Sequence, residues 1–441
     1  MKQKIVGILI FTMLIMMLSG CGKKTEDGKP ASTDSTTFSA YTDIEVYQTI
    51  PAMVVKDAKI GAVEDYGDGD YIIPVEGTEL KDYEAYVELL ESKGFDIYCD
   101  NGESALEGNV YTTTFTKSKL VVNVIHLVRM NKTLISVSED TELSEHLIYK
   151  DEYLEGNVEG AQTKVHFPEL NIINGFSSII QLKNGHFVIH DGGGSSDAEE
   201  LILYLESLTP EGEKPVVEGW FLSHSHTDHI GSIEEISLDS SLAKRIYVEG
   251  IYFFHPSKDN FGVGGGYAEI NRMYFALKSF ETQAGSEVPI YRPQMGHRYY
   301  FNDIVIDVAA TLEVLPFESL PIYHYNDTSV FLMHYIEGQK YFTTGDGGHS
   351  LQRIAMQVFP EEYFNLDVYV VPHHGINQYY YFTDYCTITT ALYPRGEMVV
   401  KDKAEETAYF LEDVQESFFR PQGDLIMTFP YTVGTAELIK R

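Results

Sequence analysis

The chain has 441 residues, of which 44% are hydrophobic and 13% aromatic, which is enough for packed cores in two or three domains. Acidic residues outnumber basic ones by 66 to 32, and the formal net charge is −34 at pH 7. This balance argues against a basic surface that grips nucleic acid or anionic lipid headgroups. It does not exclude either partner, because a metal site can supply local positive charge.

The N-terminus has the pattern of an export signal. Lys2 and Lys4 precede an almost wholly apolar run over 5–18, which is shorter than the roughly 20 residues of a membrane span but typical of a signal peptide. The Leu-Ser-Gly-Cys that ends at Cys21 resembles the lipobox of bacterial lipoproteins. The resemblance implies a signal peptide over 1–20 and a lipidated Cys21 that anchors the chain to the cell membrane, on the extracytoplasmic side of a bacterium. A soluble secreted protein or a short membrane anchor are the alternatives.

A tether and a small α+β domain are predicted next. Residues 21–37 are polar and rich in Lys, Thr, Ser, Asp, Gly and Pro, the composition of a flexible linker. Within 38–142, the apolar spacing over 79–92 predicts an amphipathic helix. Strand-like runs follow at 95–98, 109–115, 120–127 and 133–137. We therefore expect one helix on an antiparallel sheet, a domain without a metal-ligand cluster and of unknown role.

A linker over 143–165 leads to a larger domain predicted over 166–441. Two strand-like runs at 177–181 and 186–190 flank an Asn-Gly turn, the signature of a hairpin. A helix starting near Ser196 and another apolar run at 216–222 follow. Alternation of strand, helix and strand predicts a layered α/β domain.

Three histidines and a carboxylate directly follow the apolar run 216–222. They are His224, His226, Asp228 and His229. A polar cluster at the end of a buried strand lies at the mouth of a sheet, where α/β proteins place their chemistry. Neutral imidazoles and carboxylates are ligands of first-row metals, above all zinc. The sequence therefore predicts a metal site here.

Two further clusters follow strand-like runs, and together they resemble a known family. One is Gly345-Asp346-Gly347 and the other is His373-His374-Gly375. With them the chain resembles the metallo-β-lactamase superfamily of binuclear metallohydrolases over about 166–435. Its HxHxDH motif is matched by His224, His226, Asp228 and His229, its early Asp-Gly by Asp191-Gly192, its bridging aspartate by Asp346, and its last histidine lies within Pro372-His373-His374-Gly375.

The resemblance implies a four-layer αββα sandwich that holds two divalent metal ions, normally Zn2+, with Mn2+ or Fe as alternatives. The implied ligands are His224, His226, Asp228, His229, Asp346 and His373. Hydrolysis would proceed by attack of a metal-bound hydroxide, with the two ions clamping the substrate's oxyanion. Asp228, Asp346 and His374 would take catalytic roles, while Asp191 and Asn326 would orient the ligands. His373 is preferred to its neighbour as the ligand, which leaves His374 as a hydrogen-bonding or leaving-group partner.

The chain departs from the family where a further histidine usually completes the first metal's ligands. The interval contains His255, His297, His324 and His334, none in an unmistakable setting. It also contains Asn326 shortly before a strand. This pattern resembles a narrower branch, which includes the metallo-β-lactamase-like domain of bacterial DNA-uptake membrane proteins and secreted teichoic-acid phosphorylcholine esterases.

These observations lead us to expect a membrane-tethered, extracytoplasmic binuclear metal-dependent hydrolase that cleaves a phosphodiester or related phosphoester. Its substrate would be a small molecule or a cell-surface polymer. One alternative is an extracellular nuclease, although the charge of −34 weighs against tight binding of nucleic acid. Another is a non-catalytic binding or scaffolding lipoprotein that keeps the fold. The motifs outside HxHxDH disfavour β-lactam hydrolysis.

Overall fold

The computed structural model describes residues 50–67, 69–102, 105–171, 175–256, 267–280, 287–318, 325–375, 380–402, 414–419 and 423–440. All of these belong to one compact unit, Thr37–Arg441. Within the described residues, no helix is long and apolar enough to cross a membrane. The predicted signal peptide and tether lie outside this part of the chain.

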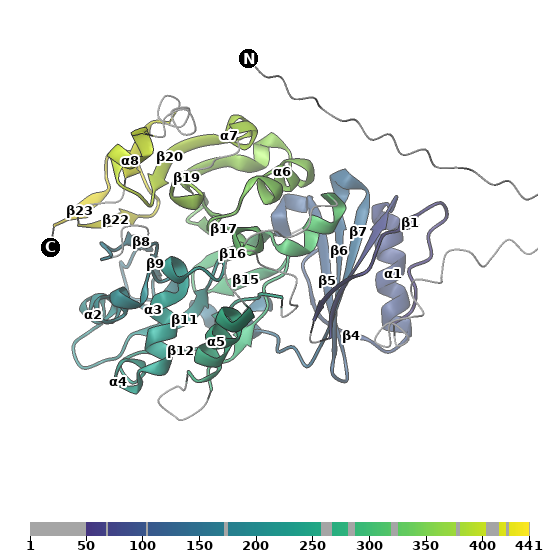
Figure 1. The fold of residues 1–441 in the computed structure, drawn as a ribbon, viewed down its shortest axis with the longest axis horizontal. Helices are drawn as coiled ribbons and strands as arrows, with labels where there is room; N and C mark the ends of the chain where they lie inside the picture. The colour runs from purple at the N-terminus through teal and green to yellow at the C-terminus, as the bar shows by residue number, and fades with distance from the viewer. Residues whose placement is uncertain are drawn as a thin grey trace, which may run out of the picture. The chain divides into compact units, whose positions relative to one another are not determined.

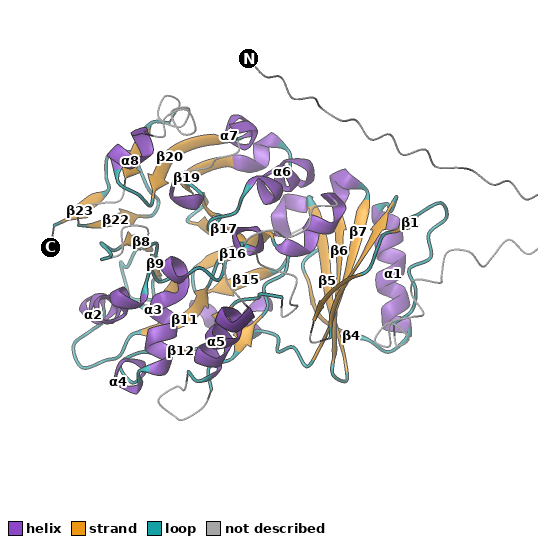
Figure 2. Ribbon diagram, in the orientation of Figure 1, coloured by secondary structure: helices purple, strands orange, loops and turns teal. Residues whose placement is uncertain are grey.

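The first domain is a seven-stranded antiparallel sheet with one helix, α1 (Leu80–Ser92), on its face (Figures 1 and 2). The strand order is β1-β3-β7-β6-β5-β4, with β2 paired to β3. The strands are β1 (Lys59–Ile60), β2 (Glu64–Gly67), β3 (Asp70–Glu76), β4 (Asp96–Asp100), β5 (Val110–Lys117), β6 (Leu120–Leu127) and β7 (Lys132–Glu139).

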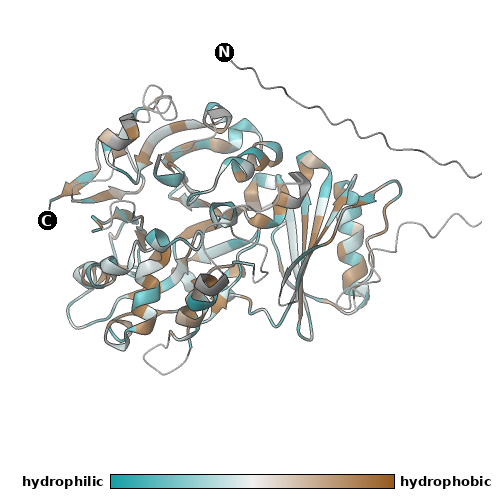
Figure 3. Cartoon of the chain, in the orientation of Figure 1, coloured by the Kyte–Doolittle hydropathy of each residue, from teal (hydrophilic) through white to brown (hydrophobic). Residues whose placement is uncertain are grey.

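Helix α1 forms because its apolar residues fall on one side. Tyr83, Tyr86 and Leu90 are buried against the sheet, and Figure 3 shows hydrophilic and hydrophobic bands alternating along the helix. At its start, the carboxylate of Asp82 accepts a hydrogen bond from the backbone N–H of Glu79 at 2.8 Å. Such a bond satisfies a donor that the helix itself leaves unpaired.

The opposite face of the first sheet packs against the second domain. Alternate residues of a strand point to opposite faces, so Ile125 and Leu134 join a different core from their neighbours, one that also holds Leu312 of the second domain. Polar contacts cross the same boundary: the Asn101 amide donates to the Gly296 carbonyl at 2.9 Å. The first domain is therefore joined to the second by a packed interface.

The second domain contains two sheets. The nine-stranded sheet has the order β14-β13-β11-β10-β9-β8-β22-β23, with β12 paired to β11. Its strands are β8 (Lys164–Phe167), β9 (Ser178–Gln181), β10 (Phe187–His190), β11 (Val216–Phe221), β12 (Tyr247–Val248), β13 (Ile251–Tyr252), β14 (Ile290–Tyr291), β22 (Asp424–Thr428) and β23 (Glu437–Ile439).

The seven-stranded sheet follows chain order from β15 to β21. Its strands are β15 (Arg298–Phe301), β16 (Ile304–Ala310), β17 (Phe331–Ile336), β18 (Gln339–Thr343), β19 (Asn365–Val370), β20 (Thr387–Tyr393) and β21 (Glu416–Phe419). The segments β10–β11 and β18–β21 are parallel, whereas β15–β18 and β8–β10 are antiparallel.

Three apolar cores separate four layers. One core lies between the two sheets and includes Val188, Phe221 and Leu332. A second packs the nine-stranded sheet against α2 (Ala198–Leu208), α3 (Thr227–Leu238), α4 (Ser240–Ala243) and α5 (Tyr267–Lys278). A third packs the other sheet against α6 (His349–Val358), α7 (Tyr380–Tyr385) and α8 (Glu397–Asp402). The predicted αββα sandwich preceded by a small α+β domain is confirmed.

Candidate metal centre

The candidate ligands follow the carboxyl ends of four strands. Asp191 comes after β10 and His224 after β11, which run parallel in one sheet. Asp346 comes after β18 and His374 after β19, which run parallel in the other sheet. Because parallel strands end at the same edge of a sheet, both sheets place these residues at one edge of the sandwich.

Two glycines let the ligand segments approach each other. A Cβ on Gly231, in α3, would lie 2.5 Å from the backbone nitrogen of Ser195, so only glycine lets this helix sit against the segment after Asp191. A Cβ on Gly345 would lie 2.5 Å from the Cβ of Ser223, and the φ of Gly345 is +53°. Glycine adopts this left-handed conformation without the steric cost that other residues meet.

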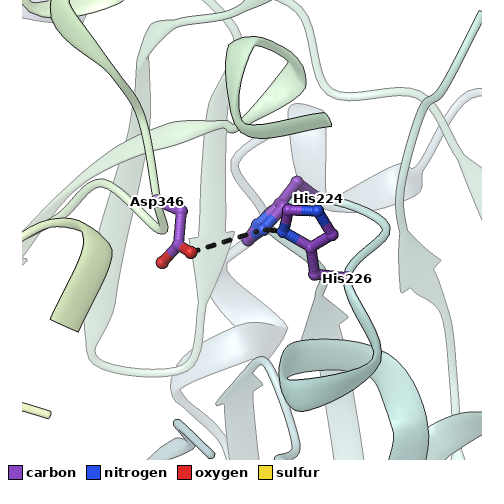
Figure 4. Close-up of side chains that lie close together, drawn as sticks. All are labelled: His224, His226 and Asp346. Atoms are coloured by element: carbon purple, nitrogen blue, oxygen red, sulfur yellow. Dashed lines mark hydrogen bonds and ion pairs between the residues drawn. The ribbon is translucent and has the colours of Figure 1, made fainter. Parts of the chain in front are cut away.

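The first group of candidate ligands is His224, His226 and Asp346. Figure 4 shows the two imidazoles beside each other, facing the carboxylate of Asp346. The Nε2 atom of His224 lies 2.8 Å from Nδ1 of His226 and 3.7 Å from Oδ2 of Asp346. Their ligand atoms all lie within 4.8 Å of one another, which is compact enough to surround one ion.

The second group is Asp228, His229 and His374. His374 Nε2 lies 3.4 Å from Oδ2 of Asp228 and 3.4 Å from Nε2 of His229. Asp346 also borders this group, with its Oδ1 3.1 Å from His229 Nε2 and its Oδ2 3.4 Å from His374 Nε2. Asp346 is therefore the one described carboxylate that contacts the histidines of both groups.

Asp191 and Ser223 hold two of the candidate ligands by hydrogen bonds to Nδ1, the ring nitrogen on the side away from Asp346. The Asp191 carboxylate accepts hydrogen bonds of 2.7 Å from the backbone N–H of Ser223, from the Ser223 hydroxyl and from Nδ1 of His229. Because the Ser223 hydroxyl donates to Asp191, its oxygen can accept from Nδ1 of His224, 2.9 Å away. With Nδ1 engaged in this way, both imidazoles direct Nε2 toward the other candidate ligands, and Nε2 is the atom that a metal would take.

The sequence did not suggest a role for Ser223. The only sign in the sequence was a hydroxyl side chain placed between the apolar end of β11 and His224. Its role depends on reaching Asp191, which lies 32 positions earlier in the chain. This contact becomes visible only when β10 and β11 are paired.

His373 and His374 occupy different places. His374 is 4% exposed and belongs to the second group, whereas the side chain of His373 is 27% exposed and its Nε2 lies 3.9 Å from Asp346 Oδ2. Both have left-handed backbones, with φ of 50° and 54°, a conformation that costs energy outside glycine and concentrates at functional sites. This geometry favours His374 as a ligand over the predicted His373, and the assignment stays a prediction.

None of the described histidines between HxHxDH and Asp346 belongs to either candidate group. His297 and His334 are buried away from both groups, the former bonded to the first domain's Asn123 and the latter to the backbone of Tyr341. His324 lies outside the described residues. Asn326 is buried and follows Tyr325, whose ring lies 5.5 Å from that of His226. Its predicted orienting role stays a prediction.

The charges within the centre are strongly coupled. Burial opposes ionisation of Asp346, but His229 and His374 hold the pKa of its carboxyl well below the usual range. Burial and the nearby His229 hold the pKa of His224 well below its usual value. Burial also opposes protonation of His229, yet Asp346 and Asp191 raise its pKa well above the ordinary value. These shifts favour the neutral form of His224 and the protonated form of His229, and a proton on His229 competes with a metal for its imidazole.

The donor set fits two divalent cations. The two groups contribute nitrogen and carboxylate oxygen atoms only, the ligands of Zn2+ and related metals. The carboxylates of Asp191, Asp228 and Asp346 concentrate negative charge beside four imidazoles. Bound cations would neutralise this charge, so the residues present are those that the implied cofactor requires.

Comparison with known proteins gives one match to a family model. Residues 171–381 match the family model of the metallo-beta-lactamase superfamily. A search of the curated proteins finds no match. Among solved structures, the chain is similar to Tm1679, a metal-dependent hydrolase of the beta-lactamase superfamily, at 14% identity over 58% of this chain and 96% of that one, with a TM-score of 0.35.

Two other solved structures are similar to part of the chain. Zn2+-bound PqqB from Methylobacterium extorquens is 10% identical over 55% of this chain and 85% of its own, with a TM-score of 0.35. A metallo-beta-lactamase with a HARLDQ motif from Cronobacter sakazakii is 12% identical over 46% and 73%, with a TM-score of 0.28. These similarities are low, and the functional inference rests on the family match and on the geometry of the site. Residues 171–381 are therefore similar to the metallo-β-lactamase superfamily, and they contain every member of the two candidate metal-binding groups.

Proposed function

We propose that the protein is a binuclear metal-dependent hydrolase that cleaves a phosphodiester or related phosphoester. The observation that carries the proposal is the position of Asp346. Its carboxylate lies 3.7 Å from His224 in the first group and 3.1 Å from His229 in the second. One carboxylate between two compact ligand groups is the arrangement of a two-metal site.

When bound, the two ions supply a hydroxide nucleophile at neutral pH and stabilise negative charge that develops on the substrate. The residues of the chain position them. Asp346 reaches both groups, while Asp191 and Ser223 fix the imidazoles of His229 and His224. Burial of His224 and His229 keeps water away from the ligand side of the centre, which strengthens each electrostatic interaction there.

A phosphoester is favoured because the chain offers little positive charge apart from that of bound metal ions. A net charge of −34 leaves anion recognition to the metal centre, and a phosphodiester places anionic oxygens beside the reacting phosphorus, where two cations can hold them. The resemblance of Asn326, Gly345-Asp346 and His373-His374 to the phosphorylcholine-esterase and DNA-uptake branch supports the same class. We place a nuclease second, because tight binding of nucleic acid requires clustered basic residues.

We further propose that the protein is tethered to the extracytoplasmic face of a bacterial membrane through lipidated Cys21. The apolar run 5–18 and the Leu-Ser-Gly-Cys sequence support this location. The small-molecule or cell-surface polymer phosphoesters of that compartment are then the substrates within reach. Labelling with a radioactive fatty acid, lost in Cys21→Ala, tests the anchor.

The test of function combines metal content with turnover. The full chain should bind two divalent ions and hydrolyse bis(p-nitrophenyl) phosphate, and His224→Ala should lower both. His186→Ala is the matched control, because His186 is a half-buried histidine that bonds Glu218 outside the centre. A protein that binds two ions yet is inert on phosphodiester, phosphomonoester, lactam and thioester substrates would instead support the non-catalytic lipoprotein alternative.

A further inference from the structure

A cavity of about 510 Å³ lies between the two domains, apart from the metal ligands. Its walls come from the start of β3 and the end of β7 in the first domain, and from α5 and the segments after β13 and before β14 in the second. This volume falls within the range of roughly 300–1,000 Å³ that is typical of small-molecule sites. Neither the metal centre nor the family motifs account for it.

The cavity carries excess negative charge. Its carboxylates are Asp70, Glu139, Asp140, Glu142 and Glu287, and its cations are Lys278 and Arg292. The charge of Arg292 is already matched by Asp70 at 2.9 Å and by the buried Glu313 at 3.0 Å. Asp140 is paired with Lys119. The remaining carboxylates outnumber Lys278, so the cavity favours a positively charged ligand.

His255 adds a hydrogen-bond acceptor to this wall. It lines the cavity, is only 2% exposed, and its Nδ1 lies 2.8 Å from the carbonyl oxygen of Pro256. Because a carbonyl can only accept, Nδ1 carries the proton and Nε2 presents a lone pair. Among the residues that the structure describes, none hydrogen-bonds this Nε2. A buried acceptor without a donor is costly, and a ligand N–H would satisfy it.

The position of His255 is fixed by its surroundings. The Tyr274 hydroxyl accepts from the His255 backbone N–H at 3.0 Å and lies 3.2 Å from its carbonyl oxygen. Apolar side chains complete the wall, among them Phe253, Ile270 and Val288. A bare metal ion would leave this apolar surface unused, whereas an organic cation with a hydrocarbon body would cover it.

We propose that the cavity binds the protonated primary amino group of an organic ligand, with the ammonium donating to His255 Nε2 and facing the carboxylates of Glu139 and Glu142. A quaternary ammonium has the charge but no N–H, so it leaves His255 without a donor. An alcohol has the donor but lacks the charge. The two requirements together specify a cation with an N–H, and a primary ammonium offers the most N–H donors of the alkylammonium ions.

One aromatic ring, that of Tyr325, lies close both to His255 of the cavity and to His226 of the first candidate group. The ring of Tyr325 lies 5.3 Å from that of His255 and 5.5 Å from that of His226, measured between centroids. We therefore assign the cavity to the amine-bearing end of the substrate, a step that rests on the proposed phosphoesterase function. It gives the first domain a role, because that domain supplies Glu139 and Glu142.

Binding is tested first, without turnover. Calorimetry on the full chain compares n-hexylamine with hexyltrimethylammonium, 1-hexanol and hexanoate, which share the same chain length. The primary amine should bind about tenfold more tightly than the quaternary ammonium, the difference expected for one hydrogen bond to a charged group, and hexanoate should not bind. Equal or tighter binding of hexyltrimethylammonium, hexanol or hexanoate overturns the proposal.

Variants then locate the site. The double variant Glu139→Gln/Glu142→Gln should weaken hexylamine by about fivefold or more, since each exposed charge contributes modestly, and His255→Phe should abolish the preference over hexyltrimethylammonium. Glu361→Gln/Glu362→Gln removes two exposed carboxylates outside the cavity and serves as the control. Loss of binding in the control, or none in the cavity variants, contradicts the assignment.

Kinetics separate this inference from the proposed function. The value of kcat/KM should be higher for 6-aminohexyl p-nitrophenyl phosphate than for hexyl p-nitrophenyl phosphate, and Glu139→Gln/Glu142→Gln should remove the difference. An inactive protein that still prefers hexylamine disproves the phosphoesterase function alone. An active protein without a preference for the aminohexyl ester disproves the substrate role of the cavity alone.

Discussion

The two candidate metal groups differ in how they are held. In the second group, Nδ1 of His229 bonds directly to the buried carboxylate of Asp191 at 2.7 Å. In the first group, Nδ1 of His224 reaches that carboxylate only through the hydroxyl of Ser223. A carboxylate partner makes an imidazole a stronger and better oriented ligand than a hydroxyl does.

The groups also differ in their number of donors. Asp346 contacts His229 and His374, so it joins the three members of the second group as a fourth side chain. His224 and His226 have Asp346 as their third partner, and none of His255, His297 and His334 joins them. Two positions that share one carboxylate can therefore have unequal affinities, and we expect the second to bind its ion more tightly.

The largest effect should follow from Asp346→Asn, which changes the side chain that both groups share. An amide cannot serve as a bridging anion, so metal content should fall at both positions and turnover of bis(p-nitrophenyl) phosphate should drop roughly 10³-fold or more. Elemental analysis and steady-state kinetics measure the two. Retention of both ions by a folded Asp346→Asn protein would contradict the shared role of Asp346.

A matched pair of neighbours gives the next largest effect. His374→Ala removes a buried member of the second group, whereas His373→Ala removes a partly exposed ring 3.9 Å from Asp346. We expect kcat/KM to fall roughly 10²–10³-fold for His374→Ala and tenfold or less for His373→Ala. A larger fall in kcat/KM for His373→Ala than for His374→Ala would identify His373 as the ligand, and the second group would then have three donors.

Substitutions of Asp191 and Ser223 should change metal affinity and activity less than substitutions of the ligands do. Partners of metal ligands typically contribute about 10–100-fold to affinity or activity. Asp191→Asn should weaken the second ion most, because His229 loses its anionic partner, and Ser223→Ala should weaken the first, because His224 loses its acceptor. Metal titration of both variants measures the affinity of each position. If both variants weaken the same position, Asp191 and Ser223 do not act on separate ions.

Local sequence patterns predicted much of the fold. The helix expected over 79–92 is α1, Leu80–Ser92, and the run 120–127 is β6. Both depend on residues close in sequence, which periodicity can detect. The pairing of β22 with β8 could not be predicted in this way, because it joins segments more than 250 positions apart. The short strands β1 and β2 were also missed, because so few residues give no clear alternation.

The sequence also predicted most of the residues of the candidate site. The motifs supplied all the members of the two groups except the choice between His373 and His374, since adjacent residues carry the same sequence signal. The two positions are told apart only by burial, because the ring of His374 is buried within the second group and that of His373 is partly exposed. The bond from Ser223 to Asp191 and the cavity beside His255 depend on strand pairing and on domain packing. Neither is encoded in a local pattern.

The smallest expected effect is a difference in proton release. Burial opposes protonation of His229 and His374, but Asp346 raises the pKa of both, whereas burial lowers that of His224. An ion that enters the second group should therefore displace more protons from His229 and His374 than an ion that enters the first displaces from His224. Below pH 7, each displaced proton should weaken binding at the second group by about tenfold per pH unit. Calorimetric titration of the metal-free chain in buffers of different ionisation enthalpy measures the protons released by each ion. We expect the tighter ion to release more than the weaker one, and equal release would mean that the two groups are not held differently.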